Sequence, residues 1–510
     1  MAKGKQAQRG EWHASKLPHV AAMPTQQRST ENNGSATGRV ARVISRRVVL
    51  PDPPSSASAP VTVHLTPWDL RLITIDYIQK GVLLPKPKDR PHHPVLVDHL
   101  ASAFARALGR FHPFAGRLVA DEHGAATTVS LRCTGEGAEF VHAAAPGVTA
   151  ADVTGTGSLH IPRDLVASLF PLNGLVSADA AAHADGPRPA PVLAAQVTEL
   201  ADAVFVAASL NHAVGDGTTF WHLMNTWSHL SRTGKATTDR SPPPEPVLER
   251  WFPDTCPVPV PLPFARLDHV VKRCHHAPLP VDECFFHFSA ECVKKLKARA
   301  NAEVTNTCID RATESTVTIS SLQAVLAHLW RAVCGARKLS PSQATTYVLL
   351  IGCRGRVKGV PPSGYVGNAV VPCKVTSTAG DVVEKGLGWA ALQLNRAVAS
   401  YNDDEASMVR DSVEKWVREP RFAYTADMLS GGSAAVGTGG SPRFDVYGND
   451  FGWGAPVAVR SGPANKMDGK TTVYQGRGGQ GAIGLEVCLA PDALARLVDD
   501  KEFMDAVAVP

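Results

Sequence analysis

The stretch SLNHAVGDGTTF, residues 209–220, decides more about this chain than any other segment. It overlaps a short apolar run, AVFVAASL at Ala203–Leu210, which predicts a buried strand. Because His212 comes directly after that strand, a rigid element holds its imidazole, and we expect the ring to face a cleft. Asp216 follows with a glycine on each side. This pattern predicts a tight turn with positive φ, so the carboxylate need not point where His212 points.

Three interpretations of this His–Asp pair stay open on the residues alone. The unperturbed pKa of histidine, about 6.5, suits His212 as a general base at neutral pH. With equal weight, His212 is a packed residue at a strand end and Asp216 caps the next helix. A metal site would use His212, Asp216 and His222 as ligands. The histidine pairs 92–93 and 275–276 do not have zinc spacing, and we expect no metal.

Composition places the chain among ordinary globular proteins and excludes several classes. Its 510 residues are 44% hydrophobic and 19% charged, which excludes a mainly disordered chain. Lys and Arg exceed Asp and Glu by 52 to 47, a formal net charge of +5. This weak excess mildly favours small anionic ligands and gives little support to nucleic-acid binding. No uninterrupted apolar stretch reaches about 18 residues, so no membrane span is expected.

The cysteines and the N-terminal segment bear on the compartment. None of the 10 cysteines forms a CxxC pair, and a chain of this size needs no disulfides, so we expect reduced thiols and a cytoplasmic protein. Residues 1–39 contain six Lys or Arg and two Glu, and they lack the apolar core of a secretory signal. We expect a disordered tail, although the acidic-poor composition is also that of a plastid transit peptide.

Apolar periodicity predicts further regular elements. A helix is expected where apolar residues recur with a spacing of three and four, and a strand where Val and Ile are dense. Ser320 or Ser321 is suited to cap the second helix. The predicted helices are Pro94–Phe111 and Ser320–Val333, and the predicted strands are Ala41–Leu50, Tyr347–Ile351 and Ala369–Val375.

Four stretches rich in glycine or proline are assigned to connections. The proline cluster 240–263 forbids regular structure and is the best interdomain linker. Residues 143–191 have weak periodicity, and we expect mostly surface connection there. SGGSAAVGTGGS, residues 430–441, lacks a phosphate-gripping GK[ST] and is expected to be a mobile loop. GRGGQG, residues 476–481, fits GxGxxG, but an alternating, strand-like segment follows, so we predict a hairpin turn.

A second distinctive stretch is NDFGWGAPVAV, residues 449–459. An acid, two aromatic residues and two glycines lie side by side in it. Glycine next to tryptophan favours a turn against which another backbone or a large side chain packs closely. We therefore interpret this segment as a structural corner without chemistry of its own.

HAVGDG and DFGWG, in this order and about 240 residues apart, resemble the two signature motifs of the plant BAHD acyl-CoA-dependent acyltransferases. The resemblance covers residues 41–505 and is specific because several further segments agree in order. These segments are LTPWDL (65–70), LASAFARALGRFHPFAGRL (100–118), SSLQAVLAHLWRAVCGAR (320–337), CRGRVKGVPPSGYVGNAV (353–370) and GLEVCLAPDALARLVDDKEFM (484–504).

Finer details resemble one branch of that family. LTPWDL, SPRFDVYGNDFGWG and AVRSGPANKMDGK are similar to an uncharacterised-acetyltransferase-like branch, which includes cuticle-related members and one member with a lyase-type reaction. Many hydroxycinnamoyl transferases have a tryptophan nine residues before the acid of DFGWG, where this chain has Ser441. This difference argues against an acceptor of the shikimate or quinate type.

The resemblance implies an α/β fold made of two similar acyltransferase domains, each with a mixed sheet and flanking helices. A channel between the domains would admit acyl-CoA from one side and the acceptor from the other. The domain limits that we expect are a tail at 1–40, an N-terminal domain at 41–239 with HxxxD, a linker at 240–263 and a C-terminal domain at 264–510 with DFGWG.

The resemblance also assigns roles to residues. His212 would remove a proton from the acceptor, and Asp216, the other HxxxD residue, would turn away and pair with an arginine of the second half. Position matching suggests Arg354, with Arg356 in reserve, although Gly352 stands where many members have an acid. No GxSxG nucleophile is present, so direct attack on the thioester is expected. The residues expected to be structural near the site are Gly217, Arg354, Asp450, Gly452, Trp453 and Gly454.

The function that follows is transfer of an acyl group from acyl-CoA to a hydroxyl or amine of a small specialised or cuticle metabolite. Acyl-CoA would be a co-substrate, with no permanently bound cofactor. We expect a monomer without nucleic-acid partners. A lyase on the same scaffold and a non-catalytic metabolite-binding protein are the alternatives. Retention of both His212 and Asp216 weakens the lyase interpretation and argues against the non-catalytic one.

Overall fold

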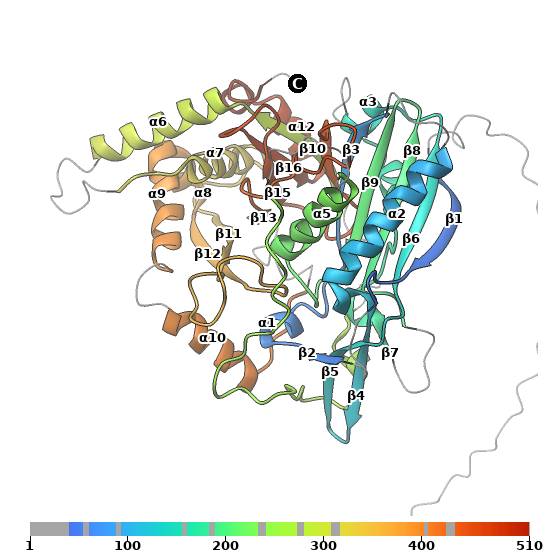
Figure 1. The fold of residues 1–510 in the computed structure, drawn as a ribbon. Helices are drawn as coiled ribbons and strands as arrows, with labels where there is room; N and C mark the ends of the chain where they lie inside the picture. The colour runs from blue at the N-terminus through green and yellow to red at the C-terminus, as the bar shows by residue number, and fades with distance from the viewer. Residues whose placement is uncertain are drawn as a thin grey trace, which may run out of the picture. The chain divides into compact units, whose positions relative to one another are not determined.

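Two six-stranded sheets and a smaller four-stranded sheet form the body of the chain, and helices pack against them (Figure 1). The α/β class expected from the sequence is confirmed. The computed structural model describes residues 40–54, 61–87, 93–155, 161–182, 189–232, 241–272, 280–307, 317–401, 406–424 and 434–508.

The helices agree with the predicted apolar periodicity. α2 and α7 lie within a few residues of their expected bounds, and Ser320 caps α7 because its Oγ accepts the amide of Gln323 at 3.3 Å. The helices are α1 (Pro67–Leu70), α2 (His93–Arg110), α3 (Ala150–Thr154), α4 (Arg163–Ser168), α5 (Gly217–Arg232), α6 (Ala290–Thr307), α7 (Ser321–Ala336), α8 (Ala379–Glu384), α9 (Gly386–Ala399), α10 (Ala406–Arg418), α12 (Pro491–Val498) and α13 (Lys501–Met504), with 3₁₀ turns η1 (His112–Ala115), η2 (Ser177–Ala180) and η3 (Leu267–Val270).

The first six-stranded sheet ends at the turn that carries His212. In order across the sheet, its strands are β1 (Arg42–Val49), β6 (Ala138–Ala145), β8 (Leu193–Leu200), β9 (Ala203–Leu210), β3 (Ile78–Pro85) and β14 (Ala458–Ser461). β9 has the predicted bounds, and every residue in it is buried. Antiparallel pairing with β8 on one side and β3 on the other fixes the end of β9.

The described residues of segment 143–191 include short helices with buried apolar side chains, so the prediction of mostly surface connection or insertion is wrong for them. The end of β6, helices α3 and α4, and η2 occupy it. Apolar residues of α3 and α4 pack with Phe205 and Ala207 of β9, and so they cover the face of the first sheet opposite α2 and α5. Helices of five and six residues are too short to show a helical period in the sequence, which explains the error.

The second six-stranded sheet contains a strand where a mobile loop was predicted. Its order is β10 (Asp282–Phe288), β16 (Ile483–Leu489), β15 (Lys470–Gln475), β13 (Ala435–Gly440), β11 (Ala344–Gly352) and β12 (Val370–Thr378). β13, AVGTGG, is a buried strand paired in parallel with β11 and β15. Glycine is depleted from strands, but here its small size lets neighbouring groups approach, as Lys470 approaches Gly439.

The structure agrees with two predictions about connections, the hairpin turn at 476–481 and the lack of regular structure in the proline-rich segment. β15 and β16 are antiparallel neighbours joined by the segment that contains 476–481, so GRGGQG is a hairpin turn. Residues 241–263 contain no helix or strand, and only the isolated bridges of Val247 and Leu262 pair there. The smaller sheet has the order β2 (Val61–His64), β5 (Ala126–Cys133), β4 (Arg117–His123) and β7 (Ala181–Ala182).

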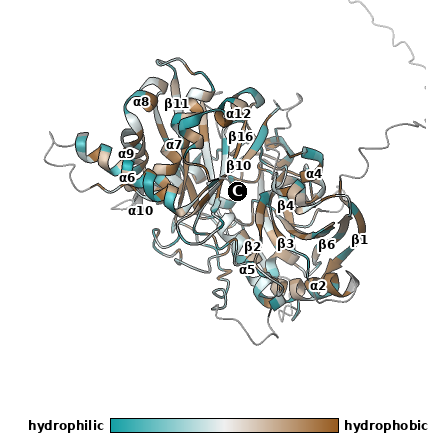
Figure 2. Ribbon diagram, turned by 90° about the horizontal axis from the view of Figure 1, so that it is seen from above, coloured by the Kyte–Doolittle hydropathy of each residue, from teal (hydrophilic) through white to brown (hydrophobic). Residues whose placement is uncertain are grey.

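The second half of the chain contributes to the first sheet. β14 pairs with β3, and Phe451 and Tyr474 belong to the hydrophobic core of the first half. Figure 2 shows the strands of the first sheet largely in hydrophobic brown, whereas helix α6 is largely hydrophilic teal. Residues from both halves therefore surround the end of β9. The domain limits expected at 239 and 264 stay a prediction.

Several predictions concern residues beyond the described ranges. The tail 1–39, His92, the pair His275 and His276, Cys274 and Cys308 lie outside them. The other eight cysteines are free thiols, five of them buried. Within the described ranges, no helix combines the length and the apolar composition that crossing a membrane requires.

Candidate active site

Hydrogen bonds from η2, from within the turn and from the second half of the chain hold the backbone around His212. The amide of His212 donates to Ser177 Oγ on η2 at 3.0 Å. Asn211 donates to the Ser177 carbonyl at 2.9 Å and accepts the amide of Ala213 at 2.9 Å. From the second half of the chain, Asn368 Nδ2 donates to the His212 carbonyl at 2.8 Å. The imidazole is therefore carried by a backbone that both halves of the chain fix.

The His212 Nδ1 has no hydrogen-bond partner among the described residues, and the Asn368 side chain is close enough to the ring to act on its pKa. Nδ1 is enclosed, whereas Nε2 is not, so Nε2 is the ring atom open to a substrate. Burial lowers the pKa of His212 below its usual value; the Asp216 charge acts to raise it, and the positive charge of Lys470 lowers it further. A neutral imidazole at pH 7 follows, which is the form that accepts a proton.

Asp216 is turned away from His212 into a fully bonded buried position. Arg354 donates to its two oxygens at 2.7 and 3.0 Å, which confirms the predicted pairing. Arg356 instead donates to the Gly352 carbonyl at 2.7 Å. Asp216 is only 2% exposed. Burial alone would raise the pKa of Asp216, but the Arg354 guanidinium holds it below its usual value, so the pair is ionised.

The carboxylate is directed by helix capping rather than by a left-handed turn. Asp216 Oδ1 accepts the amides of Thr218 and Thr219 at 3.0 and 3.1 Å, in the first turn of α5. Neither Gly215 nor Gly217 has a positive φ, so that prediction is wrong. Glycine is needed at 215 for space, because a Cβ there would lie 2.6 Å from the Thr219 side chain. The structural interpretation of Asp216 as a cap is thus correct.

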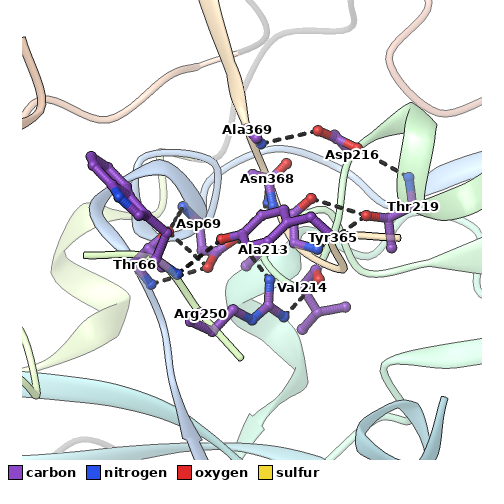
Figure 3. A network of polar contacts seen from close by, with 12 residues as sticks. Thr66, Asp69, Ala213, Val214, Asp216, Thr219, Arg250, Tyr365, Asn368 and Ala369 are labelled. Carbon is purple, nitrogen blue, oxygen red and sulfur yellow. Dashed lines mark hydrogen bonds and ion pairs between the residues drawn. The ribbon is translucent and has the colours of Figure 1, made fainter. Parts of the chain in front are cut away.

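A second aspartate, Asp69, joins the two halves near Asp216, and the two carboxylates accept the amides of the adjacent residues Asn368 and Ala369 (Figure 3). Asp69 Oδ1 accepts the backbone amide and the side-chain amide of Asn368 at 3.0 and 2.9 Å. Asp69 Oδ2 accepts the Thr66 hydroxyl at 2.8 Å, and Arg250 Nη1 lies 3.6 Å from Oδ1. Arg250 also donates to the Val214 carbonyl at 3.0 Å. The turn 211–216 is therefore held between two aspartate–arginine pairs.

Sequence reasoning missed Asp69, Asn368 and Arg250 as parts of this site. Asp69 and Asn368 lie in segments that carried the family resemblance, LTPWDL and CRGRVKGVPPSGYVGNAV, so a signal was present. Arg250 lies in the proline-rich linker, where nothing local distinguishes it. Its burial beside Asp69 shows that the proline-rich segment supplies a residue to the site.

The DFGWG segment is a backbone corner, as its glycines predicted. Asp450 Oδ1 accepts the amides of Gly452, Trp453 and Gly454 at 2.7, 3.1 and 3.0 Å. The two glycines have φ of +113° and +131°, which other residues rarely adopt. Trp453 Nε1 donates to the carbonyl of Pro85, the last residue of β3, at 2.9 Å. The corner thus anchors the chain before β14 enters the first sheet.

The structure does not assemble the metal site that was considered. Asp216 is bonded to Arg354, and His222 Nε2 lies 2.7 Å from the Pro244 carbonyl. Within the described ranges, no three His, Cys, Asp or Glu side chains converge as metal ligands.

Curated proteins are similar to this chain over most of its length. The chain is 33% identical to an uncharacterised acetyltransferase of Arabidopsis thaliana, over 87% of this chain and 94% of that protein. It is also 33% identical to the Arabidopsis protein Enhanced Pseudomonas Susceptibility 1, over 92% and 98%. Identity to the Arabidopsis BAHD acyltransferase DCR is 29%, over 86% and 88%.

Solved structures share the fold. Vinorine synthase aligns with a TM-score of 0.63 at 18% identity, over 92% of this chain and 99% of that one. TRI101 of F. sporotrichioides, crystallised with coenzyme A and T-2, aligns with a TM-score of 0.64 at 17% identity, over 88% and 99%. The model of the Transferase family matches residues 41–504. The chain therefore belongs to the Transferase family and, within it, to the plant BAHD acyltransferases.

Proposed function

We propose that this enzyme transfers an acyl group from acyl-CoA to a hydroxyl or amine of a small plant metabolite, with His212 as the general base. The observation that carries the proposal is the environment of His212. Its imidazole is neutral at pH 7, its Nε2 is open, and its backbone is fixed from both halves of the chain. A positioned base of this kind contributes about 10²–10⁴-fold to a rate.

The reaction then needs two proton movements at one atom. Nε2 of His212 takes the proton of the acceptor as the acceptor oxygen or nitrogen attacks the thioester carbon. The tetrahedral intermediate collapses, the carbon–sulfur bond breaks, and the CoA thiolate leaves. The imidazolium returns its proton to that thiolate, so the enzyme ends the cycle neutral at this position.

In this proposal Asp216 and Arg354 hold His212 in place and take no part in the proton transfer. The contacts of the Asp216 carboxylate with Arg354 and with the first turn of α5 engage both of its oxygens, so neither oxygen is directed at the His212 ring to share its proton. The pair fixes the first turn of α5 against the second half of the chain and thereby holds the turn that carries His212.

We predict that no covalent acyl-enzyme forms, because direct attack needs no nucleophilic side chain. The intact mass of the protein should be unchanged after incubation with acyl-CoA alone. A stable acyl adduct on a serine or cysteine, removed when acceptor is added, would contradict direct transfer.

We predict an acid limb of kcat/KM that lies below the usual histidine pKa of about 6.5. The pKa of His212 is lowered by burial, so the imidazole stays neutral, and active, at pH values where an exposed histidine would be half protonated. Activity should fall only as pH drops through this lowered pKa. A midpoint above 6.5 would show that the base is another group or that His212 is solvated.

The function is tested by an activity matrix of acyl-CoA donors against alcohols and amines, read by mass spectrometry. Formation of an acylated acceptor together with free CoA supports the proposal. Cleavage of an acceptor without CoA consumption would indicate a lyase, and binding without any turnover would indicate a metabolite-binding protein. The cuticle link, the cytoplasmic location and the monomeric state stay predictions.

A further inference from the structure

A cavity lies between α1 and α10, two helices from opposite halves of the chain that pack against each other (Figure 1). Its volume is about 230 Å³. It has apolar and aromatic walls with one positive side chain among them: Pro67, Trp68 and Arg71 from the first half, and Val413 and Trp416 from the second. An apolar cavity of about 150 Å³ holds a benzene molecule, so this one has room for an aromatic ring with a small substituent.

Contacts within the protein hold the walls of this cavity. The Trp68 ring stacks on that of Trp251 with the ring centroids 4.8 Å apart. On the opposite wall, Trp416 Nε1 donates to a backbone carbonyl just after α10 at 2.6 Å. The amide of Ala423 donates to the Arg71 carbonyl at 2.8 Å, which ties the segment after α10 to the residue after α1. The cavity is therefore formed without a ligand, as small-molecule sites usually are.

The half-buried Arg71 brings an unpaired positive charge to the cavity. In the described part of the chain no hydrogen bond or ion pair reaches its guanidinium, and its nitrogens are not among the enclosed atoms. Burial lowers the pKa of Arg71, and the Cys353 thiol, rather than a carboxylate, acts against this effect. Arginine stays protonated in proteins, so the guanidinium is available to an anion that enters the cavity.

The other charged residues of the lining are exposed to solvent. Arg421 and Glu419 form an ion pair at 3.3 Å and have 77% and 61% of their side chains exposed, and Lys415 is exposed as well. Trp68 Nε1, by contrast, is an enclosed donor with no acceptor among the described residues, although buried donors usually have one. Arg71 and Trp68 together therefore favour a ligand that accepts hydrogen bonds and carries one negative charge.

We propose that this cavity binds a small aromatic carboxylate, whose charged group pairs with Arg71 and whose ring packs on the aromatic walls. A guanidinium and a carboxylate are planar partners that form two parallel hydrogen bonds. One arginine balances a monoanion, whereas a phosphate group at pH 7 carries more negative charge than Arg71 offsets. The inference goes beyond the proposed function, and binding is measured without CoA or turnover, so either can fail while the other stands.

Calorimetric titration of the full chain with three probes tests the proposal. Benzoate and benzamide have nearly the same shape and differ in charge, and inorganic phosphate is an anion without a ring. Wild type should bind benzoate about 10- to 100-fold more tightly than benzamide, the range for a charge-assisted hydrogen bond. Phosphate should bind more weakly than benzoate, and tighter binding of phosphate would contradict a carboxylate site.

The variants decide whether Arg71 is responsible. Arg71→Met keeps an unbranched side chain and leaves no described side chain without its partner, so it should fold, abolish the preference for benzoate and leave benzamide binding unchanged. Arg71→Lys should restore part of the preference. Arg418→Met, at the exposed end of α10 and outside the lining, is the matched control and should bind as wild type does. Absence of benzoate binding, equal affinities in wild type, or a preference that persists in Arg71→Met would overturn the proposal.

A chemical readout places the ligand at the arginine itself. Phenylglyoxal modifies accessible guanidinium groups, and peptide mass spectrometry reports each labelled residue. Saturating benzoate should protect Arg71 and leave the labelling of Arg418 unchanged. Equal labelling of Arg71 with and without benzoate would show that the anion binds elsewhere.

The carboxylate belongs either to the acceptor of the proposed reaction or to a separate small molecule. Benzoate titration in the presence of a saturating acceptor from the activity matrix distinguishes these sources. Displacement of benzoate assigns the carboxylate to the acceptor, and undisturbed benzoate binding assigns it to a separate ligand.

Discussion

His212→Ala is expected to lower turnover by about 10²–10⁴-fold and to leave the fold and CoA affinity unchanged. The imidazole is the proposed base, so its loss removes proton transfer from the rate-limiting chemistry. His212 Nδ1 has no partner among the described residues, and the Asn368 amide keeps its bonds to Asp69 and to the His212 carbonyl after truncation, so no buried group loses its main partner. Thiol release with a working substrate pair measures the rate, and a thermal melt measures the fold.

The control for this substitution is a histidine that lies outside the site. His123, at the exposed end of β4, provides it, and His123→Ala should keep full activity. Activity of His212→Ala within threefold of wild type would remove His212 from the role of base. A large loss of melting temperature in the same variant would mean that the lost activity reports unfolding.

Removal of either partner of the buried pair between Asp216 and Arg354 is expected to cost about 3–5 kcal/mol of unfolding free energy. Each side chain is almost fully buried, at 3% and 8% side-chain exposure, so the partner left behind is an uncompensated charge. Asp216→Asn and Arg354→Ala should therefore each lower stability and activity together. This contrasts with His212→Ala, which should lower activity alone.

The double variant provides the sharper test. Since the second substitution removes the stranded charge, the stability losses should be much less than additive. Denaturant melts and rates on wild type, both single variants and the double variant measure the cycle. Arg356→Ala is the matched control, because Arg356 bonds to the Gly352 carbonyl and should leave stability near wild type. Additive losses would show that Asp216 and Arg354 do not meet in solution.

The local part of the site could be predicted from the sequence. The stretch 203–220 by itself predicts a buried strand, a histidine at the end of that strand and an aspartate at the start of a helix. The structure contains all three features. The turn type was predicted wrongly, because glycine serves both for left-handed backbone and for close packing. At position 215 the packing of Thr219 requires it.

The long-range part could not be predicted from spacing or periodicity. Arg354 lies 138 residues from Asp216, and only the family resemblance indicated the pair. Arg250 carries no local signal, since its importance comes from the Asp69 carboxylate that lies beside it in space. The strand β13 was missed for a related reason: its glycines lower strand propensity, and its burial between two parallel neighbours overrides that preference.

The most direct test of His212-assisted acyl transfer is a stoichiometric time course with wild type and His212→Ala. Acylated acceptor and free CoA are quantified by mass spectrometry in the same samples. We predict equal amounts of the two products at every time point, with the variant slower by about 10²–10⁴-fold. Acceptor modified without release of CoA, or equal rates in the two proteins, would contradict acyl transfer by a His212 base.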